Sequence, residues 1–478
     1  MIYDHPLISG VYRLSPILAQ NMLVSTYGLL KRLERKGHTA SAYNVMLRES
    51  QFWPAECLRE YQDELLRRLI QHAYENVPYY RRVFDELRLN PGEIRTAMDL
   101  YKLPVLRKDD VRRFNHELQA RNVPSYRATV GRTGGTTGIP LRFLLDKDRV
   151  IFDRCLTERQ WNWAGYRPGD KVVVLRGLTL IPQDTHTRVY WRFDWADNRI
   201  YLSGFHISRD TAPLYIRKLQ EWRPQFIAAY PSSAYTLARF MEQEGVIIPV
   251  RALFTSSEVL SPAERNIIER QFACKVWDRY GTGERLAVSQ QCEQGSYHQN
   301  SEFGIMQVDS PMGQPAPIKT KGEVVQTGLT NYSMPLIRYA IGDGGYLQNE
   351  ACSCGRSLPG IGPMDGRKDD VIVTADGRLM PRAGLDQVYE FVKNLERCQL
   401  VQERIGEVIV RVLPRPGFGV LDEGELKSQL HLRLGAGTEV IVQVTDNLLL
   451  TAAGKERFII SKVDLNQRAV FDLNPRTD

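Results

Sequence analysis

The sequence predicts an α/β protein in which a large N-terminal domain is followed by a small, mobile α+β domain. The chain has 478 residues, more than one ordinary hydrophobic core accommodates. From about residue 145, short apolar runs alternate with helical stretches, which predicts parallel and mixed sheets flanked by helices. After residue 300 the β content rises, and this predicts a β-rich subdomain within the large domain.

The first 125 residues are predicted to be a helical part of the large domain. Apolar residues from Leu65 to Ala73 recur at helical spacing until Pro78 ends the run. Strands are predicted further along, at residues 171–177, 226–230, 251–257 and 275–281. The last unit has the alternating strands "EVIVRVLP" and "TEVIVQVT" around a helix, and its boundary is placed in "GRKDD". The predicted parts are therefore residues 1–125, 126–366 and 367–478.

Composition excludes several classes of protein. The chain is 43% apolar and 25% charged, and its net charge of +7 is spread without a basic stripe among aromatics, so no nucleic-acid partner is expected. Seven cysteines in a chain of this length do not predict a secreted disulfide framework. The N-terminus shows no signal peptide, which predicts a cytoplasmic protein. The uncharged stretch 14–30 is too polar to span a bilayer, so we expect a helix docked on the protein body, without membrane contact.

The stretch "GRTGGTTGIP", residues 131–140, is the first candidate for ligand binding. Small residues let backbone N–H groups approach an anion closely, and clustered hydroxyl groups add donors. The stretch lacks the Gly-Lys-Ser/Thr ending of a Walker loop. On its own it fits a phosphate loop and a flexible turn equally well. The loops 255–260 and 280–286 are further candidates, because ligands of open α/β sheets bind at the carboxyl ends of the strands.

Four further motifs follow in a fixed order: "YGTGE" (280–284), "LIRYAIGD" (336–343), "GRKDD" (366–370) and "TAAGKERF" (451–458). With the Gly-rich loop, they make the sequence resemble the adenylate-forming (AMP-binding) ligase superfamily. The resemblance is to its phenylacetate–CoA ligase-like branch, which includes relatives from capsular polysaccharide biosynthesis, and it covers about residues 52–465. It implies an ATP-dependent, AMP-forming ligase that activates a carboxylic acid as an acyl-adenylate and passes the acyl group to a thiol, coenzyme A.

The resemblance also implies a role for each motif residue. Lys455, Glu284 and Thr137 would be catalytic, with Lys455 at the carboxylate–phosphate junction and Glu284 on Mg²⁺. Asp369 would be the hinge of the small domain. The remaining nucleotide-binding positions would be Thr133, Gly135, Thr136, Gly138, Ser256, Ser257, Glu258, Tyr280, Gly281, Thr282, Asp343 and Arg367. The chain departs from the usual pattern at Gly134, Ile139 and Gly283, where serine, lysine and threonine are usual.

Cys292-x5-His298 and Cys352-x-Cys354 form a second constellation. Three thiols and one imidazole suit a tetrahedral structural Zn²⁺ site, although buried or free cysteines fit the spacing as well. Some members of the phenylacetate–CoA ligase-like branch, which the sequence resembles, carry a similar set of three cysteines and one histidine, and this favours zinc. His206 is a weaker candidate for the acyl pocket, and Trp161 and Trp163 are expected in the core.

Two other functions stay open at this stage. The acyl group could pass to an amine or hydroxyl acceptor, which would make an amide or ester in polysaccharide or natural-product biosynthesis. Alternatively, the chain could be a catalytically weak nucleotide-binding module. The acidic and basic motif residues Glu284, Asp343, Arg367 and Lys455 favour an enzyme.

Overall fold

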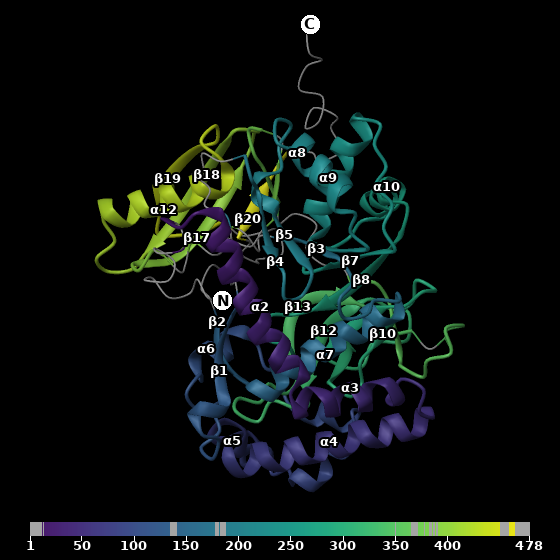
Figure 1. The fold of residues 1–478 in the computed structure, drawn as a ribbon. Helices are drawn as coiled ribbons and strands as arrows, with labels where there is room; N and C mark the ends of the chain where they lie inside the picture. The colour runs from purple at the N-terminus through teal and green to yellow at the C-terminus, as the bar shows by residue number, and fades with distance from the viewer. Residues whose placement is uncertain are drawn as a thin grey trace, which may run out of the picture.

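The computed structural model divides the chain into an N-terminal group of helices, a large mixed sheet with a smaller β-rich unit, and a separate C-terminal sheet (Figure 1). It describes residues 12, 14–133, 141–176, 181, 188–348, 350–364, 371–376, 378–381, 385, 388, 391–449 and 458–463. The predicted fold class, a large α/β domain followed by a small α+β unit, is therefore confirmed.

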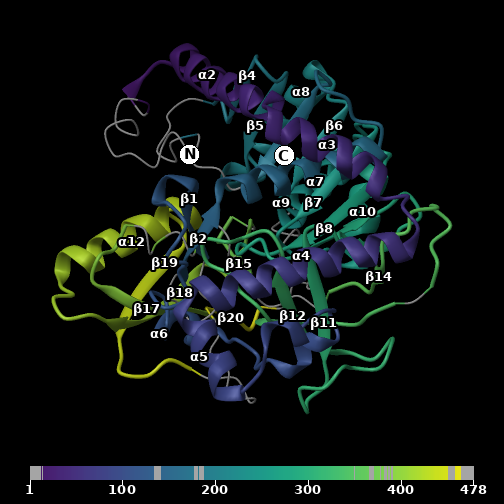
Figure 2. The same cartoon turned by 90° about the horizontal axis from the view of Figure 1, so that it is seen from below.

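Helices dominate the N-terminal part, as predicted. They are α2 (Ile17–Lys36), α3 (His38–Ser50), α4 (Ala55–Asn76), α5 (Pro78–Leu87) and the short α6 (Lys108–Arg113). The apolar residues Leu66, Leu69, Ile70 and Ala73 lie on the buried face of α4. Pro78 ends this helix and starts the next, where its missing N–H costs no hydrogen bond. Figure 2 shows α4 running across the molecule beneath the sheets.

Helix α2 docks on the edge strand β4 (Trp191–Asp194), in agreement with the prediction for the stretch 14–30. The side-chain oxygen of Asn21 accepts a hydrogen bond from the N–H of Phe193 at 2.9 Å. Gly28 permits the close approach, because a Cβ at this position would collide with the carboxylate of Asp194. No helix within the described ranges has both the length and the apolar character needed to cross a membrane.

The large sheet has nine strands in the order β14-β10-β9-β8-β7-β6-β3-β5-β4. Its centre is parallel and consists of β5 (Arg199–Ser203), β3 (Val172–Arg176), β6 (Phe226–Ala229), β7 (Ala252–Ser256) and β8 (Lys275–Gly281). All of these except β5 match predicted strands. The remaining strands are antiparallel to their neighbours: β4, β9 (Val288–Gln291), β10 (Tyr297–Gln299) and β14 (Gly360–Ile361). The carboxyl ends of the parallel strands therefore share one edge, where a ligand crevice is expected.

Apolar side chains cover both faces of this sheet. The helices α8 (Ala212–Trp222), α9 (Pro231–Gln243) and α10 (Pro262–Phe272) pack against one face. On the other face, α7 (Lys147–Trp163) contributes Trp161, which stacks on Phe254 with ring centroids 4.8 Å apart. Trp161 is thus a core residue, as predicted, whereas Trp163 is only partly buried at the margin of the same cluster.

The Gly-rich stretch connects a β-hairpin formed by β1 (Ala128–Thr133) and β2 (Leu141–Asp146). Gly131 lies in β1, where a Cβ would collide with the ring of Phe143 on the partner strand. The close packing against Phe143 thus explains why residue 131 is a glycine. The turn itself, residues 134–140, lies outside the described residues.

A second sheet, β11-β12-β13, forms the predicted β-rich unit. Its strands are Gly304–Asp309, Gly322–Gly328 and Tyr339–Gly345, all antiparallel. A parallel bridge between Leu106 and Tyr339 joins it to the helical part. The motif "LIRYAIGD" therefore continues into β13, which pairs with β12 on one side and with Leu106 on the other.

The C-terminal sheet has the order β19-β18-β17-β20, and α12 (Val420–Leu434) packs on it. Its strands are β17 (Leu395–Gln402), β18 (Glu407–Pro414), β19 (Glu439–Val444) and β20 (Ile459–Ser461), preceded by the hairpin of β15 (Val371–Val373) and β16 (Leu379–Pro381). One residue of the large domain, Phe205 in the turn η5 (Gly204–His206), is buried within this small core. The proposed boundary at residues 366 and 367 lies outside the described residues.

Gly28→Ala tests the docking of α2. The new methyl group would meet the Asp194 carboxylate, so we expect the free energy of unfolding to fall by about 1–3 kcal/mol. Urea denaturation of the full chain measures the change. The matched control is Gly424→Ala in α12, where nothing lies within 4 Å of the new Cβ and a gain of about 0.5–1 kcal/mol is expected. Equal stability of Gly28→Ala and the wild type would contradict the tight contact.

Candidate active site and metal centre

The carboxyl ends of β7 and β8 bring the first group of predicted residues together. Ser256 ends β7 in register with Arg279 of β8, so the loops that follow both strands emerge side by side. Ser257 has a φ of 75°, a left-handed conformation that turns the chain sharply out of the strand. Glu258 accepts a hydrogen bond from the backbone N–H of Ser232, at the start of α9, at 2.9 Å. Burial raises the pKa of Glu258 to about 7.

Tyr280 and Asp343 connect two of the motifs directly. The phenol of Tyr280, near the end of β8, donates a hydrogen bond to Oδ2 of Asp343 in β13 at 2.9 Å. The two residues are 63 positions apart and belong to different sheets. Gly342, with a φ of 86°, supplies the left-handed backbone that precedes Asp343. The "YGTGE" and "LIRYAIGD" motifs therefore face one common space.

Glu284, four residues after Tyr280 in the same motif, is only 7% exposed. Its Oε1 accepts a hydrogen bond from the phenol of Tyr339 at 3.2 Å, again from the second motif. Burial and the nearby Glu284 carboxylate both raise the pKa of Tyr339, so this phenol stays a hydrogen-bond donor. The hydroxyl oxygen of Thr282 is also buried and has no hydrogen-bond partner in the described part of the chain. An acidic group and a hydroxyl group thus point to a polar ligand here.

Arg149 fixes the turn that follows Glu284. Its guanidinium is buried, donates to the carbonyl groups of Arg285 and Leu286, and reaches the hydroxyl of Thr330 at 2.6 Å. Sequence reasoning missed this residue. The available signal was its spacing: Arg149, Phe152, Leu156 and Arg159 recur on one face of α7, and all four are buried. An arginine on an apolar helix face points to a buried partner.

Several predicted site residues cannot be added to this geometry. Thr133 ends β1, next to the turn of the hairpin. The others lie outside the described residues: Gly135, Thr136, Thr137, Gly138, Arg367, Asp369 and Lys455. Gly134 and Ile139 lie there as well. Their roles stay predictions.

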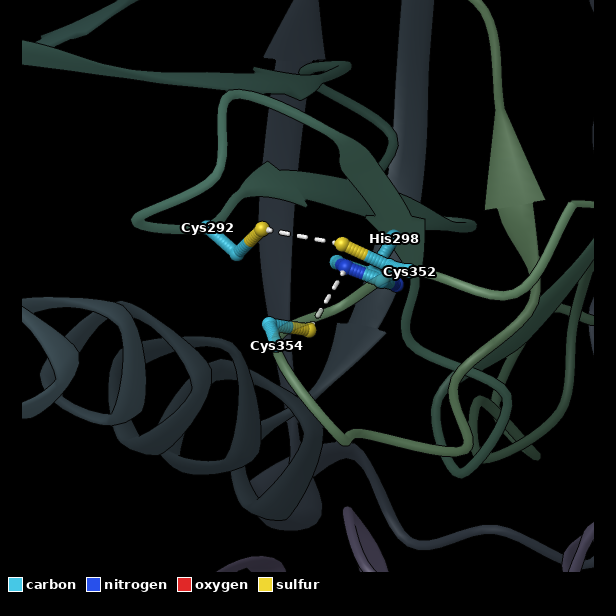
Figure 3. A group of neighbouring side chains, drawn as sticks. All are labelled: Cys292, His298, Cys352 and Cys354. Carbon is cyan, nitrogen blue, oxygen red and sulfur yellow. Dashed lines mark hydrogen bonds between the residues drawn. The ribbon is translucent and has the colours of Figure 1, made fainter.

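The four predicted metal ligands do come together, as Figure 3 shows. Cys292 follows β9, His298 lies in β10, and Cys352 and Cys354 come from the segment between β13 and β14. One ligand atom from each residue lies within 4.8 Å of all the others. The sulfur atoms of Cys292 and Cys352 are 3.7 Å apart. Thiolates on one tetrahedral Zn²⁺ are separated by about 3.8 Å, so the spacing suits a metal and excludes a disulfide.

The imidazole of His298 is oriented for metal binding. Its Nδ1 lies 2.9 Å from the carbonyl oxygen of Leu358, to which it donates, so Nε2 is left with a free lone pair. This Nε2 lies 3.4 Å from Sγ of Cys354. A backbone partner of this kind fixes the tautomer and the ring plane of a ligating histidine. The described residues therefore supply four ligands and one orienting contact.

Arg356 braces the metal centre against the helical part. It donates to both carboxylate oxygens of Glu293, at 2.9 and 2.8 Å, and to the side-chain oxygen of Gln51 at 3.1 Å. Its guanidinium lies 4.2 Å from the ring of Trp163, whose indole N–H also donates to Gln51. Trp163 thus contacts residues that surround the metal centre, and it also packs at the margin of the core.

His206, the weaker candidate, lies at the contact between the two domains. Its ring stacks on Tyr190 with centroids 5.1 Å apart, and Nδ1 lies 2.7 Å from the hydroxyl of Ser203. The neighbouring carbonyl of Phe205 accepts a hydrogen bond from Arg378 of the small domain. These contacts give His206 a structural role, and its role in an acyl pocket stays a prediction.

Comparison with known proteins agrees with the motif order. A family model for the CapK C-terminal domain matches residues 372–462. The phenylacetate-coenzyme A ligase of Thermus thermophilus is 29% identical over 386 residues, covering 79% of this chain and 82% of that protein. Protein CapK of Staphylococcus aureus is 25% identical over 465 residues, covering 96% of this chain and all of that protein (100%).

Along most of its length, the chain is similar to adenylate-forming ligases of the phenylacetate–CoA ligase-like branch. The resemblance predicted from five short motifs is therefore confirmed. Its fold is shared with a crystal structure of 2-hydroxyisobutyryl-CoA ligase in complex with 2-HIB-AMP and CoA. The TM-score is 0.59 at 22% identity, over 87% of this chain and 91% of that chain.

Cys352→Ser tests the metal centre of this ligase homologue. Protein purified without chelators is expected to contain one zinc per chain, and the variant is expected to lose it. Without the metal, buried thiols and an imidazole face one another, so the free energy of unfolding should fall by more than about 3 kcal/mol. Elemental analysis and thermal unfolding measure both effects.

Cys57→Ser is the matched control for this experiment, because Cys57 is exposed and is not one of the four clustered ligands. It should retain both the zinc and the melting temperature of the wild type. Wild-type protein that carries no stoichiometric metal would refute the zinc site.

Proposed function

We propose that the protein is an ATP-dependent, AMP-forming ligase that activates a carboxylic acid and transfers its acyl group to the thiol of coenzyme A. One observation carries this proposal. Tyr280 and Asp343, from motifs in two different sheets, meet in a 2.9 Å hydrogen bond, and Tyr339 of the second motif contacts the buried carboxylate of Glu284 in the first. A shared position at the carboxyl ends of parallel strands is typical of a nucleotide site.

The first half-reaction would join the acid to AMP. A carboxylate oxygen attacks the α-phosphorus of ATP, the bond to the bridging oxygen breaks, and pyrophosphate leaves. Negative charge shifts onto the phosphate oxygens, so positioning and electrostatic stabilisation supply the catalysis. Glu284 would hold Mg²⁺, which supplies this charge stabilisation when bound. Lys455 would approach the oxygen at which the new bond forms.

The remaining motif residues would hold the nucleotide. Asp343 would accept hydrogen bonds from the ribose hydroxyl groups, and Tyr280 would lie against the adenine. The loop of Ser256, Ser257 and Glu258 would line the adenine pocket with Gly281 and Thr282. Arg367 would contact ribose or phosphate. Thr133, Gly135, Thr136, Thr137 and Gly138 would bind the terminal phosphates.

The second half-reaction would need a different group at the same centre. The sulfur of coenzyme A attacks the acyl carbon, the thioester forms, and AMP leaves with the bonding electron pair. We propose that the small domain rotates about Asp369 between the two steps, which removes Lys455 and admits the thiol. The separate core of this domain, into which the large domain inserts Phe205, supports such a unit.

The zinc ion would be structural in this scheme. Three thiolates and one imidazole fill a tetrahedral shell and leave no open position for a substrate. The cluster connects the segment after Glu284 to the segment after Asp343. The metal would therefore hold the two site motifs in a fixed position relative to each other. We further propose a cytoplasmic protein whose partners are small molecules and not nucleic acid.

An amine or hydroxyl acceptor is the alternative to coenzyme A. The CapK model matches the small domain, and CapK of Staphylococcus aureus matches almost the whole chain. The small domain would act in the transfer step, so the acceptor is the part of the reaction in which this chain could differ from the CoA ligases.

Pyrophosphate release tests the first half-reaction and the acceptor together. Aryl, fatty and amino acids are offered with ATP, with and without coenzyme A, and products are followed by mass spectrometry. We expect pyrophosphate to depend on the acid and the thioester to depend on coenzyme A. Consumption of an added amine without coenzyme A would support the alternative acceptor. ATP binding without pyrophosphate from any acid would leave only a nucleotide-binding module.

Glu284→Gln tests the proposed magnesium ligand. The amide keeps the size of the side chain and still accepts from Tyr339, but it loses the charge. We expect adenylation to slow about 100-fold or more at unchanged thermal stability. Glu64→Gln is the control, since it removes an exposed carboxylate that pairs with Arg68 on α4. Wild-type adenylation by Glu284→Gln would refute the assignment.

Lys455→Ala separates the two half-reactions. The lysine would act only while the acyl-adenylate forms, so its loss should slow pyrophosphate release about 100-fold or more. Thioester formation from a supplied acyl-adenylate should keep its rate. Equal loss in both assays would show that Lys455 stabilises the fold or binds the shared intermediate.

A further inference from the structure

Arg176 ends β3 at the centre of the large sheet. Residues of β3 pair with β5 on one side and β6 on the other, so Arg176 lies level with Ser203 and one step beyond the Leu175–Ala229 pair. Its position is therefore the carboxyl end of the middle parallel strand. Ligands of open α/β sheets bind at this edge, and the nucleotide motifs follow strands of the same edge.

The charge of Arg176 has no counter-ion among the described residues. Its Nε is buried without a hydrogen-bond partner, and no carboxylate lies within ion-pair distance of the guanidinium there. Burial lowers the pKa of this side chain, and the nearby cations Arg279 and Arg199 lower it further. The guanidinium lies 5.9 Å from the ring centroid of Tyr230, at the end of the neighbouring strand. A guanidinium stays charged in proteins, so this setting favours an anion.

Unlike Arg176, the neighbouring arginines have carboxylate partners. Arg279 pairs with the carboxylate of Asp153, and Arg199 lies 3.9 Å from that of Asp197. Their charges are thus compensated within the protein. Arg176 is partly exposed although its Nε is buried, so part of its side chain is accessible to a molecule at this edge of the sheet.

Strand order separates Arg176 from the nucleotide motifs. Strand β3 is two strands from β7, which leads to Ser256, and three strands from β8, which leads to Tyr280. Adjacent strands lie about 4.8 Å apart, so these separations are about 10 and 14 Å between backbones. An anion at Arg176 would therefore lie apart from the adenine and the ribose, which the motifs after β7 and β8 would bind.

We propose that Arg176 binds a second carboxylate of the acyl substrate, remote from the carboxylate that is activated. The substrate class is then a dicarboxylic acid. This inference rests on the proposed function, because it takes the activated carboxylate to lie near Glu284. The guanidinium forms paired hydrogen bonds with a planar carboxylate, and Tyr230 provides an aromatic wall beside it.

Matched acids test the inference. Glutarate is compared with pentanoate, and terephthalate with 4-methylbenzoate, by kcat/KM for pyrophosphate release. The wild type is expected to prefer the dicarboxylate of each pair at least 10-fold, which is the effect of one charge-assisted contact. Arg176→Leu should lose this preference and gain activity on the monocarboxylate, and Arg176→Lys should retain part of it. The KM for ATP should stay constant.

Arg251→Leu is the control variant. Arg251 precedes β7 at the opposite edge of the sheet, is exposed, and also lies near an aromatic ring, 6.0 Å from the centroid of Phe226. It should keep the wild-type preference. A merely structural role of Arg176 would lower activity on both acids of a pair equally, and that result would overturn the inference while the ligase activity stands.

Calorimetric binding of glutarate and terephthalate without ATP separates this inference from the proposed function. Tighter binding of the dicarboxylates by the wild type than by Arg176→Leu, with no pyrophosphate from any acid, would support the Arg176 site and refute the ligase activity. Equal binding by both proteins, in the absence of turnover, would refute both.

Discussion

The buried guanidinium of Arg149 is the contact on which the candidate site depends. It starts on α7, donates to the carbonyls after Glu284 and to Thr330 beyond β12, and lies 4.0 Å from the ring of Phe303. One side chain thereby joins a helix, the end of the nine-stranded sheet and the second sheet. Burial lowers the pKa of Arg149 to about 9, and the nearby Asp153 and Asp146 carboxylates oppose this shift. Gly328 leaves the space that this guanidinium needs.

A similar arrangement holds the other side of the site. Arg338, inside the "LIRYAIGD" motif, is buried, pairs with Asp309 at 2.5 Å and donates to the carbonyl of Leu103 at 3.1 Å. The motif arginine thus anchors its strand, from which Tyr339 contacts Glu284 and Asp343 contacts Tyr280. Because both anchors are charged and buried, removing either would leave a carboxylate or several carbonyl groups unpaired, which is costlier than losing an exposed ion pair.

The sequence predicted the central strands well because they are short, apolar runs bounded by turn residues, which is the pattern of a strand buried on both faces. The parallel strand β5 and the antiparallel strands β4, β9, β10 and β14 were not predicted, since they are short and carry polar residues such as Arg199, Gln290 and His298. For the metal centre, the residue types predicted the ligands. That Cys292, His298 and the Cys352 segment lie close together depends on strand pairing between distant parts of the chain, which the sequence does not show. Arg149 and Arg176 were missed, because neither belongs to a motif and their significance comes from partners distant in sequence.

The insertion of Phe205 into the small core has a consequence for motion between the domains. Its ring is 4% exposed and lies among residues such as Ile372 and Met380, while Arg378 binds its carbonyl. Any rotation of the small domain must withdraw this ring and hydrate it, at a cost of about 1.5–3 kcal/mol. Movement between the two orientations would therefore expose the Phe205 ring to water. For both orientations to be equally populated, the second must bury this ring against other apolar side chains.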